Sequence, residues 1–170
     1  MKHKLIVLNL CYGFARPSNW YFCPQFHKVA KVINDNIGKF DSCLIINDVH
    51  NKEDREFKYL PPHCVHNSID IAPARDFYQA LSDGVKDIGN IQVVYKSTLN
   101  AFASESNFTL ISDIIVNEEK FYLAGFNVST DIIPTALGFI DDGRDFVVLR
   151  DACGDINTEL KNKGLDYLKL

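Results

Sequence analysis

The chain has 170 residues, of which 46% are hydrophobic and 24% are charged, and its formal net charge is −4. These values are typical of a globular protein that buries one core, and they exclude a disordered or membrane-embedded chain. The slight acidic excess, without any basic block, argues against nucleic acid as a partner. We therefore expect one domain over residues 1–170.

The cysteines and the first residues indicate the compartment. Five cysteines are scattered without CxxC spacing, which argues against a disulfide framework or a zinc knuckle and favours reduced thiols. The apolar run after the initial MKHK covers only LIVLNL, which is too short for a signal sequence or a membrane span. We therefore expect a cytoplasmic protein without a membrane partner.

The first half of the chain predicts two buried strands around a helix. Leu5–Leu10 is a nearly continuous apolar run, the pattern of a strand buried on both faces in a parallel sheet. Apolar residues from Phe26 to Ile37 follow at helical spacing, and Gly38 ends that helix. Cys43–Ile46 predicts a second buried strand, which runs into a long polar segment with three histidines.

The second half continues the alternation of strands and helices. This order predicts an α/β fold, a three-layer, doubly wound parallel sheet of five to six strands. The helices are expected over Ala74–Lys86 and Phe108–Val116, and the strands over Ile91–Tyr95, Lys120–Gly125, Asp145–Arg150 and, as a short last strand, Leu165–Leu170.

The stretch Tyr122–Gly154 is the clearest unit of this pattern. An apolar run ends at Gly125, Thr135–Ile140 has helical spacing, and a second apolar run follows. A parallel pair of strands needs such a crossover, and ligands of open α/β sheets collect at the carboxyl ends of the strands. We therefore expect the functional site in the loops that begin at Gly125 and Arg150.

The same stretch resembles a known family. It reads G-F-N-V-S-T-D-I-I-P-T-A from Gly125, then Gly143, then D-A-C-G from Asp151. This order resembles the isochorismatase-like cysteine hydrolases of the nicotinamidase branch, whose loop and helix run G-x-x-T-x-x-C-V-x-x-T-A. The resemblance implies that fold over nearly the whole chain and a homo-oligomer, either a dimer or a tetramer. It also places Asp131 on the family's nucleophilic cysteine.

The resemblance implies a catalytic triad of which this chain keeps only the lysine. The family combines an aspartate after strand one, a lysine after strand three and the cysteine. Its first motif, D-x-Q-N-D-F, falls on Asn9 to Phe14 and keeps only the phenylalanine, whereas Lys96 and Asn100-Ala101-Phe102 keep the lysine motif. The triad positions thus read Asn9, Lys96 and Asp131. Asn9 has no basic oxygen and Asp131 no thiolate, so we expect no ordinary amidase turnover.

The triad positions retain an ion pair. An aspartate at the amino end of a helix beside a lysine is expected to be a stable carboxylate. The simplest interpretation is that Asp131 is a helix cap and Lys96 its neutralising partner. The resemblance also implies a cis peptide bond between Phe126 and Asn127.

A second group of polar residues follows the second strand. The nicotinamidases have D-x-H there, a further ligand a few residues on, and a fourth in P-x-H-C. Here DVH from Asp48 and PPHC from Pro61 match, and they enclose a glutamate. The resemblance implies one divalent metal ion, either zinc, iron or manganese, which suits two imidazoles and two carboxylates. The candidate ligands are Asp48, His50, Glu56 and His63.

Alternatives to this ligand set remain open. His66 could replace either histidine, and Glu53 could replace Glu56. The ordinary interpretation is a polar loop whose histidines make hydrogen bonds to the backbone.

The resemblance also implies a small-molecule pocket. Cys11 stands where the family has a pocket glutamine, and on a strand it would share the face of Asn9. It is a candidate for a relocated nucleophile, although a buried cysteine is an ordinary core residue. The candidate ligand-binding residues are Cys11, Phe14, Leu60, Phe126 and Asn127.

Three functions follow from these patterns. The leading hypothesis is a non-catalytic family member that binds a metal or a small carboxylate- or pyridine-like ligand. The second is a hydrolase of a small amide or vinyl ether with an altered mechanism through Asp131 or Cys11. It would need Asp131 as a proton donor, and Lys96 is expected to lower the pKa of Asp131, which disfavours that role. The third is an interaction module that supports oligomerisation.

Overall fold

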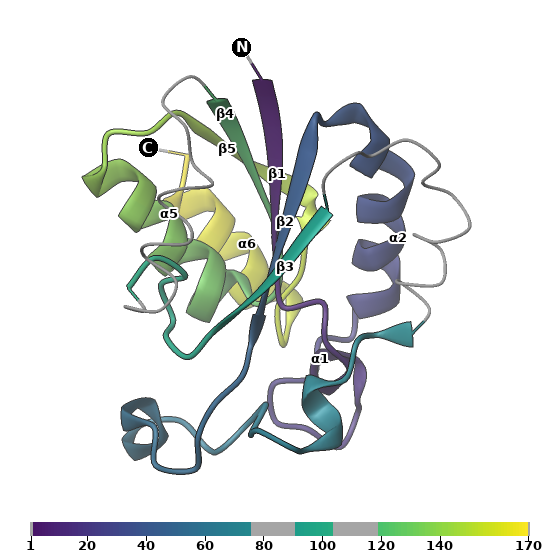
Figure 1. The fold of residues 1–170 in the computed structure, drawn as a ribbon, viewed down its shortest axis with the longest axis vertical. Coiled ribbons are helices and arrows are strands. Elements are labelled where there is room, and N and C mark those ends of the chain that lie inside the picture. The colour runs from purple at the N-terminus through teal and green to yellow at the C-terminus, as the bar shows by residue number, and fades with distance from the viewer. Residues whose placement is uncertain (1, 76–90, 104–118, 170) are drawn as a thin grey trace.

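A computed structural model of the protein describes residues 2–75, 91–103 and 119–169. In this part of the chain, five parallel strands form one sheet in the order β3-β2-β1-β4-β5. Helix α2 covers one face of the sheet, and α5 and α6 cover the other (Figure 1). This three-layer α/β arrangement confirms the expected fold class. The strands are β1 (Lys2–Leu8), β2 (Ser42–Asp48), β3 (Ile91–Lys96), β4 (Glu119–Gly125) and β5 (Phe146–Cys153).

Helices and short turns connect these strands. The expected helix over Phe108–Val116, and that over Ala74–Lys86 beyond its first two residues, lie outside the described residues. Among the helices that are described, none is long and apolar enough to cross a membrane. The helices are α1 (Tyr12–Ala15), α2 (Phe26–Asn36), α5 (Ile133–Asp141) and α6 (Thr158–Tyr167), and the turns are η1 (Ile37–Lys39), η2 (Arg55–Lys58), η3 (Ile69–Ile71) and the π-helical η4 (Val128–Ile132).

The expected last strand over Leu165–Leu170 is wrong, because residues 158–167 form α6. The side-chain oxygen of Asn157 accepts the backbone N–H of Leu160 at 2.8 Å and so caps the start of this helix. Leu165 is buried in the core, and Leu168, three residues later, packs partly against it. Leu165 lies in the last turn of α6, and Leu168 is the C-cap residue at which the helix ends.

Strand β1 lies at the centre of the sheet and is buried on both faces. Leu5 and Val7 pack in the core on the α2 side, whereas Ile6 and Leu8 pack in the core beneath α5 and α6. This explains why the sequence of β1 is continuously apolar instead of alternating.

The carboxyl ends of the strands meet at one edge of the sheet. Gly125 ends β4 with φ +113°, and a β-carbon there would clash with the carbonyl oxygen of Leu8. The backbone N–H of Phe126 donates to that same oxygen at 3.0 Å. Glycine permits this close approach, so the loop after β4 lies directly against the end of β1.

Candidate functional site

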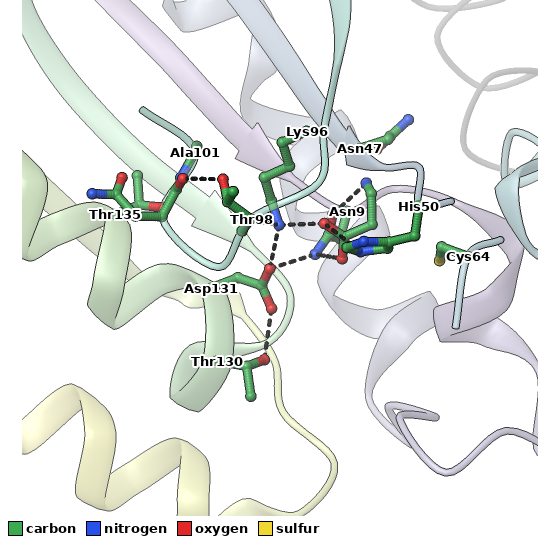
Figure 2. A network of polar contacts seen from close by, with 12 residues as sticks. Asn9, Asn47, His50, Cys64, Lys96, Thr98, Ala101, Thr130, Asp131 and Thr135 are labelled. Atoms are coloured by element: carbon green, nitrogen blue, oxygen red, sulfur yellow. Dashed lines mark hydrogen bonds and ion pairs between the residues drawn. The ribbon is translucent and has the colours of Figure 1, made fainter. Parts of the chain in front are cut away.

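The three triad positions meet at this edge of the sheet. Lys96 ends β3, Asn9 follows β1, and Asp131 lies in η4 (Figure 2). The Lys96 ammonium donates to Asp131 Oδ1 at 2.6 Å, and Asn9 Nδ2 donates to the same oxygen at 3.0 Å. All three side chains are buried. The expected contact between Lys96 and Asp131 is confirmed, as is the cis peptide bond between Phe126 and Asn127.

The Asp131 carboxylate is held by four donors. Besides the two donors on Oδ1, its Oδ2 accepts the backbone N–H of Asn127 at 3.2 Å and the Thr130 hydroxyl at 2.6 Å. Burial raises the pKa of Asp131, and the Lys96 ammonium acts against that rise. The expectation of a lowered pKa is therefore wrong, because complete burial outweighs the neighbouring charge.

The Lys96 ammonium is shared between two carboxylates. It donates to Asp48 Oδ1 as well as to Asp131, and to the carbonyl oxygen of Thr98 at 3.2 Å. Burial would lower the pKa of Lys96, but the carboxylates of Asp131 and Asp48 outweigh burial and hold that pKa above its usual value. Lys96 is therefore a permanent cation that joins the triad positions to the candidate metal ligands.

Asn9 bridges the same two carboxylates. Its Nδ2 also donates to Asp48 Oδ2 at 2.9 Å, and its Oδ1 accepts the backbone N–H of Asp48 at 3.0 Å. Its φ of 61° is a backbone conformation that asparagine tolerates better than most residues. An ionised aspartate at position 9 would place a negatively charged oxygen, instead of the Nδ2 donor, against the carboxylates of Asp48 and Asp131. The amide at position 9 therefore suits a carboxylate at position 131.

The candidate metal ligands form one buried cluster. Asp48, His50 and His63 each offer a ligand atom, and these atoms all lie within 4.8 Å of one another. Glu56 Oε1 lies 3.6 Å from His50 Nε2 and 3.3 Å from His63 Nε2. Burial and the nearby Asp48 raise the pKa of Glu56 to about 7. Both His50 Nε2 and Glu56 Oε1 are buried without a hydrogen-bond partner.

Both histidines are anchored through Nδ1. His50 Nδ1 lies 3.0 Å from Asp54 Oδ2, and His63 Nδ1 lies 3.0 Å from the carbonyl oxygen of Pro61. These oxygens accept only, so each Nδ1 carries the proton and each Nε2 keeps its lone pair. Burial lowers the pKa of His50, which keeps the ring neutral. Histidines that bind metals are oriented in this way, so the residues present fit a divalent ion.

The structure separates the alternative ligands from this cluster. Glu53 and His66 are exposed, whereas Glu56 and His63 face each other. Two residues that contribute to the site were missed, Asp54 behind His50 and Thr130 beside Asp131. The four-residue spacing from His50 to Asp54 does not by itself predict a contact, because the two side chains meet only where the loop folds back on itself.

The cavity at this site is very small. Its volume is about 10 Å³, which is room for about one water molecule. Of the candidate ligand-binding residues, Phe14, Leu60 and Asn127 line it, together with Asp48, Glu56, His63 and Asp131. Cys11 and Phe126 are not among the residues that line it, and both are fully buried in the core on the α2 side of the sheet.

The five cysteines are buried thiols. Cys11 Sγ lies 3.7 Å from Cys64 Sγ, in a contact that raises the pKa of the Cys64 thiol. Burial raises the pKa of Cys23 to about 11 and those of Cys43 and Cys153 to about 12. Thiols of this kind are poor nucleophiles at neutral pH.

We expect none of the five thiols to react with Ellman's reagent in the folded protein, because burial prevents access to them. All five should react after unfolding in guanidinium chloride, which the absorbance of the released thiolate would count. Fast reaction of one thiol in the native protein, absent from Cys11→Ala, would contradict this expectation and support a relocated nucleophile.

The chain is similar to known proteins in sequence and in structure. The family model of the isochorismatase domain matches residues 19–170. A nicotinamidase from Bacillus subtilis superimposes with a TM-score of 0.78 and 21% identity, over 99% of this chain and 95% of that chain. An isochorismatase-like hydrolase from Alkaliphilus metalliredigens superimposes with a TM-score of 0.79 and 18% identity, over 99% of this chain and 91% of that chain. A pyrazinamidase from Pyrococcus horikoshii, in complex with zinc, superimposes with a TM-score of 0.76 and 21% identity, over 99% of this chain and 95% of that chain. No curated protein matches the sequence.

Proposed function

Because this chain belongs to the isochorismatase domain family, we propose that it binds a divalent metal ion and has lost the family's cysteine-hydrolase activity. The ion would be held by Asp48, His50, Glu56 and His63. In a bound state it would supply Lewis-acid chemistry and lower the pKa of a coordinated water. The metal would be zinc, iron or manganese, the ions that suit imidazole and carboxylate ligands.

One observation carries the metal proposal. His50 Nε2 and Glu56 Oε1 face each other at 3.6 Å, and both are buried without a hydrogen-bond partner. Two buried acceptor atoms that face each other are unfavourable unless a proton or a cation lies between them. A divalent ion would satisfy both atoms together.

The loss of hydrolase activity is supported by the Asp131 contacts. The family's nucleophile position holds a carboxylate with four donors, and the family's proton-acceptor position holds the Asn9 amide, which donates to that carboxylate. Neither group can repeat the thiolate chemistry. The cavity of about 10 Å³ also leaves no room for a pyridine ring, so the proposal is for metal and water instead of an organic ligand.

The alternative is a hydrolase with an altered mechanism. The raised pKa of Asp131 favours it, because a proton donor needs that direction of shift. Its weakness is geometric, since all four acceptor directions of Asp131 are occupied and Cys11 does not reach the cavity. We therefore rank it second.

The metal proposal is tested by binding. Purified protein, stripped with a chelator and reloaded, should hold about one equivalent of zinc, iron or manganese in elemental analysis. We expect His50→Ala to lower zinc affinity by at least ~100-fold, and the exposed His66→Ala to leave it unchanged. No uptake of any of the three metals, or equal affinity in both variants, would reject the proposed site.

A further inference from the structure

The geometry of the metal-ligand set depends on a residue that contributes no ligand atom to it. We propose that Asp54 is a positioning residue, whose carboxylate holds the His50 imidazole so that Nε2 is left free for the metal. The inference rests on the proposed metal function and extends it. Asp54 Oδ2 lies 3.0 Å from His50 Nδ1, on the side of the ring away from the other ligands.

The Asp54 carboxylate is held in place by hydrogen bonds other than its contact with His50. Its Oδ2 also accepts the backbone N–H of Asn51 at 3.1 Å, and its own backbone N–H donates to the carbonyl oxygen of Asn51 at 3.1 Å. These two bonds close a turn, so the carboxylate occupies a defined place instead of following the imidazole. A fixed acceptor can therefore select one orientation of the ring.

The same residue also starts the turn that presents Glu56. The backbone N–H of Phe57 donates to the Asp54 carbonyl oxygen at 3.0 Å, which opens η2. The Phe57 ring then lies beside His50 and His63, with centroid distances of 5.1 and 5.4 Å. The side chain of Asp54 thus orients one ligand, and its main chain begins the turn that carries another.

The role of Asp54 follows from what happens without it. A buried Nδ1–H with no acceptor is costly, so the neutral ring would move its proton to Nε2, where Glu56 Oε1 lies 3.6 Å away and could accept it. A proton there occupies the lone pair that the metal needs. His63 provides an internal reference, because its Nδ1 partner is the backbone carbonyl of Pro61, which side-chain substitutions leave in place.

The tautomer can be measured without any metal. We expect long-range ¹H–¹⁵N correlation spectra of the stripped, histidine-labelled protein to show His50 protonated at Nδ1. Asp54→Ala should move that proton to Nε2 and leave the His63 signals in place, which also shows that the variant is folded. Asp54→Asn keeps an acceptor oxygen and should retain the wild-type tautomer. Glu53→Ala removes an exposed carboxylate from the same loop and should change nothing.

Zinc affinity gives the second readout, by competition with a chromophoric chelator. Asp54→Ala should bind zinc about 10- to 100-fold more weakly, Asp54→Asn should lose less, and Glu53→Ala should match the wild type. Retention of the Nδ1 proton in Asp54→Ala overturns the inference, whatever the affinity. If the wild-type protein binds no zinc, the proposed function fails, while a shifted tautomer in the stripped variant still supports the positioning role of Asp54.

Discussion

Lys96→Met is expected to lower the free energy of unfolding by about 3–5 kcal/mol, because it leaves two buried carboxylates without their shared cation. The Lys96 ammonium donates to Asp48 and Asp131, and all three side chains are almost inaccessible to solvent. Methionine preserves the length and the packing of the side chain, so the loss reports the charge. Urea denaturation followed by circular dichroism measures it.

The control is a lysine whose ion pair lies in water. Lys31 pairs with Asp35 at 2.6 Å on the exposed face of α2, and Lys31→Met should change stability by no more than about 0.5 kcal/mol. Lys96→Met combined with Asp131→Asn should recover part of the loss, because one unpaired carboxylate is removed. Equal stability of Lys96→Met and Lys31→Met would show that the buried cluster is not an ion pair in solution.

The unmodified protein is expected to hydrolyse neither nicotinamide nor pyrazinamide. Removal of a complete nucleophile and base set typically costs a rate factor of about 10⁶, which places any turnover below detection in an ammonia-release assay. Turnover by the unmodified protein that Asp131→Ala abolishes would overturn the proposal and support Asp131 as the reactive group. Turnover by the unmodified protein that Cys11→Ala abolishes would also overturn the proposal and would support Cys11 as the reactive group.

A variant with the family's triad residues tests whether the missing residues or the small cavity prevents turnover. Asn9→Asp with Asp131→Cys supplies a thiol beside Lys96 together with a proton acceptor, which places the family's three residue types at these positions. We expect the double variant still to leave nicotinamide intact, because the cavity of about 10 Å³ excludes a pyridine ring. Turnover by the double variant would show that the cavity opens for substrate.

Much of the fold could be predicted because strands β1 and β2 are buried on both faces. The continuous apolar runs of β1 and β2 have few other interpretations, and polar residues at the strand ends then had to meet at one edge of the sheet. This is why Lys96 and Asp131 could be placed together. The cluster of Asp48, His50 and His63 could be proposed from motif spacing, because both halves of the motif fall between two strands.

The other features of the fold and of the site depend on contacts that no sequence pattern indicates. Leu165 suits a strand as well as a helix, and the Asn157 cap decides between them. The pKa of Asp131 depends on how completely the site is closed, which a neighbouring lysine does not reveal. The small cavity likewise results from side chains that converge from several separate loops.

The double role of Asn9 has a consequence for the history of this chain. Its amide donates to Asp48 and Asp131 together, so the residues at positions 9 and 131 are not free to change independently. If Asn9 reverted to aspartate first, three carboxylates would surround one ammonium, whereas a first reversion of Asp131 to cysteine would remove only one acceptor. A chain with an acid at position 9 and a cysteine at position 131 would therefore reach the present pair most easily if the acid changed before a carboxylate appeared at position 131. The same asymmetry makes a change of Asn9 to aspartate unfavourable as long as Asp131 is present.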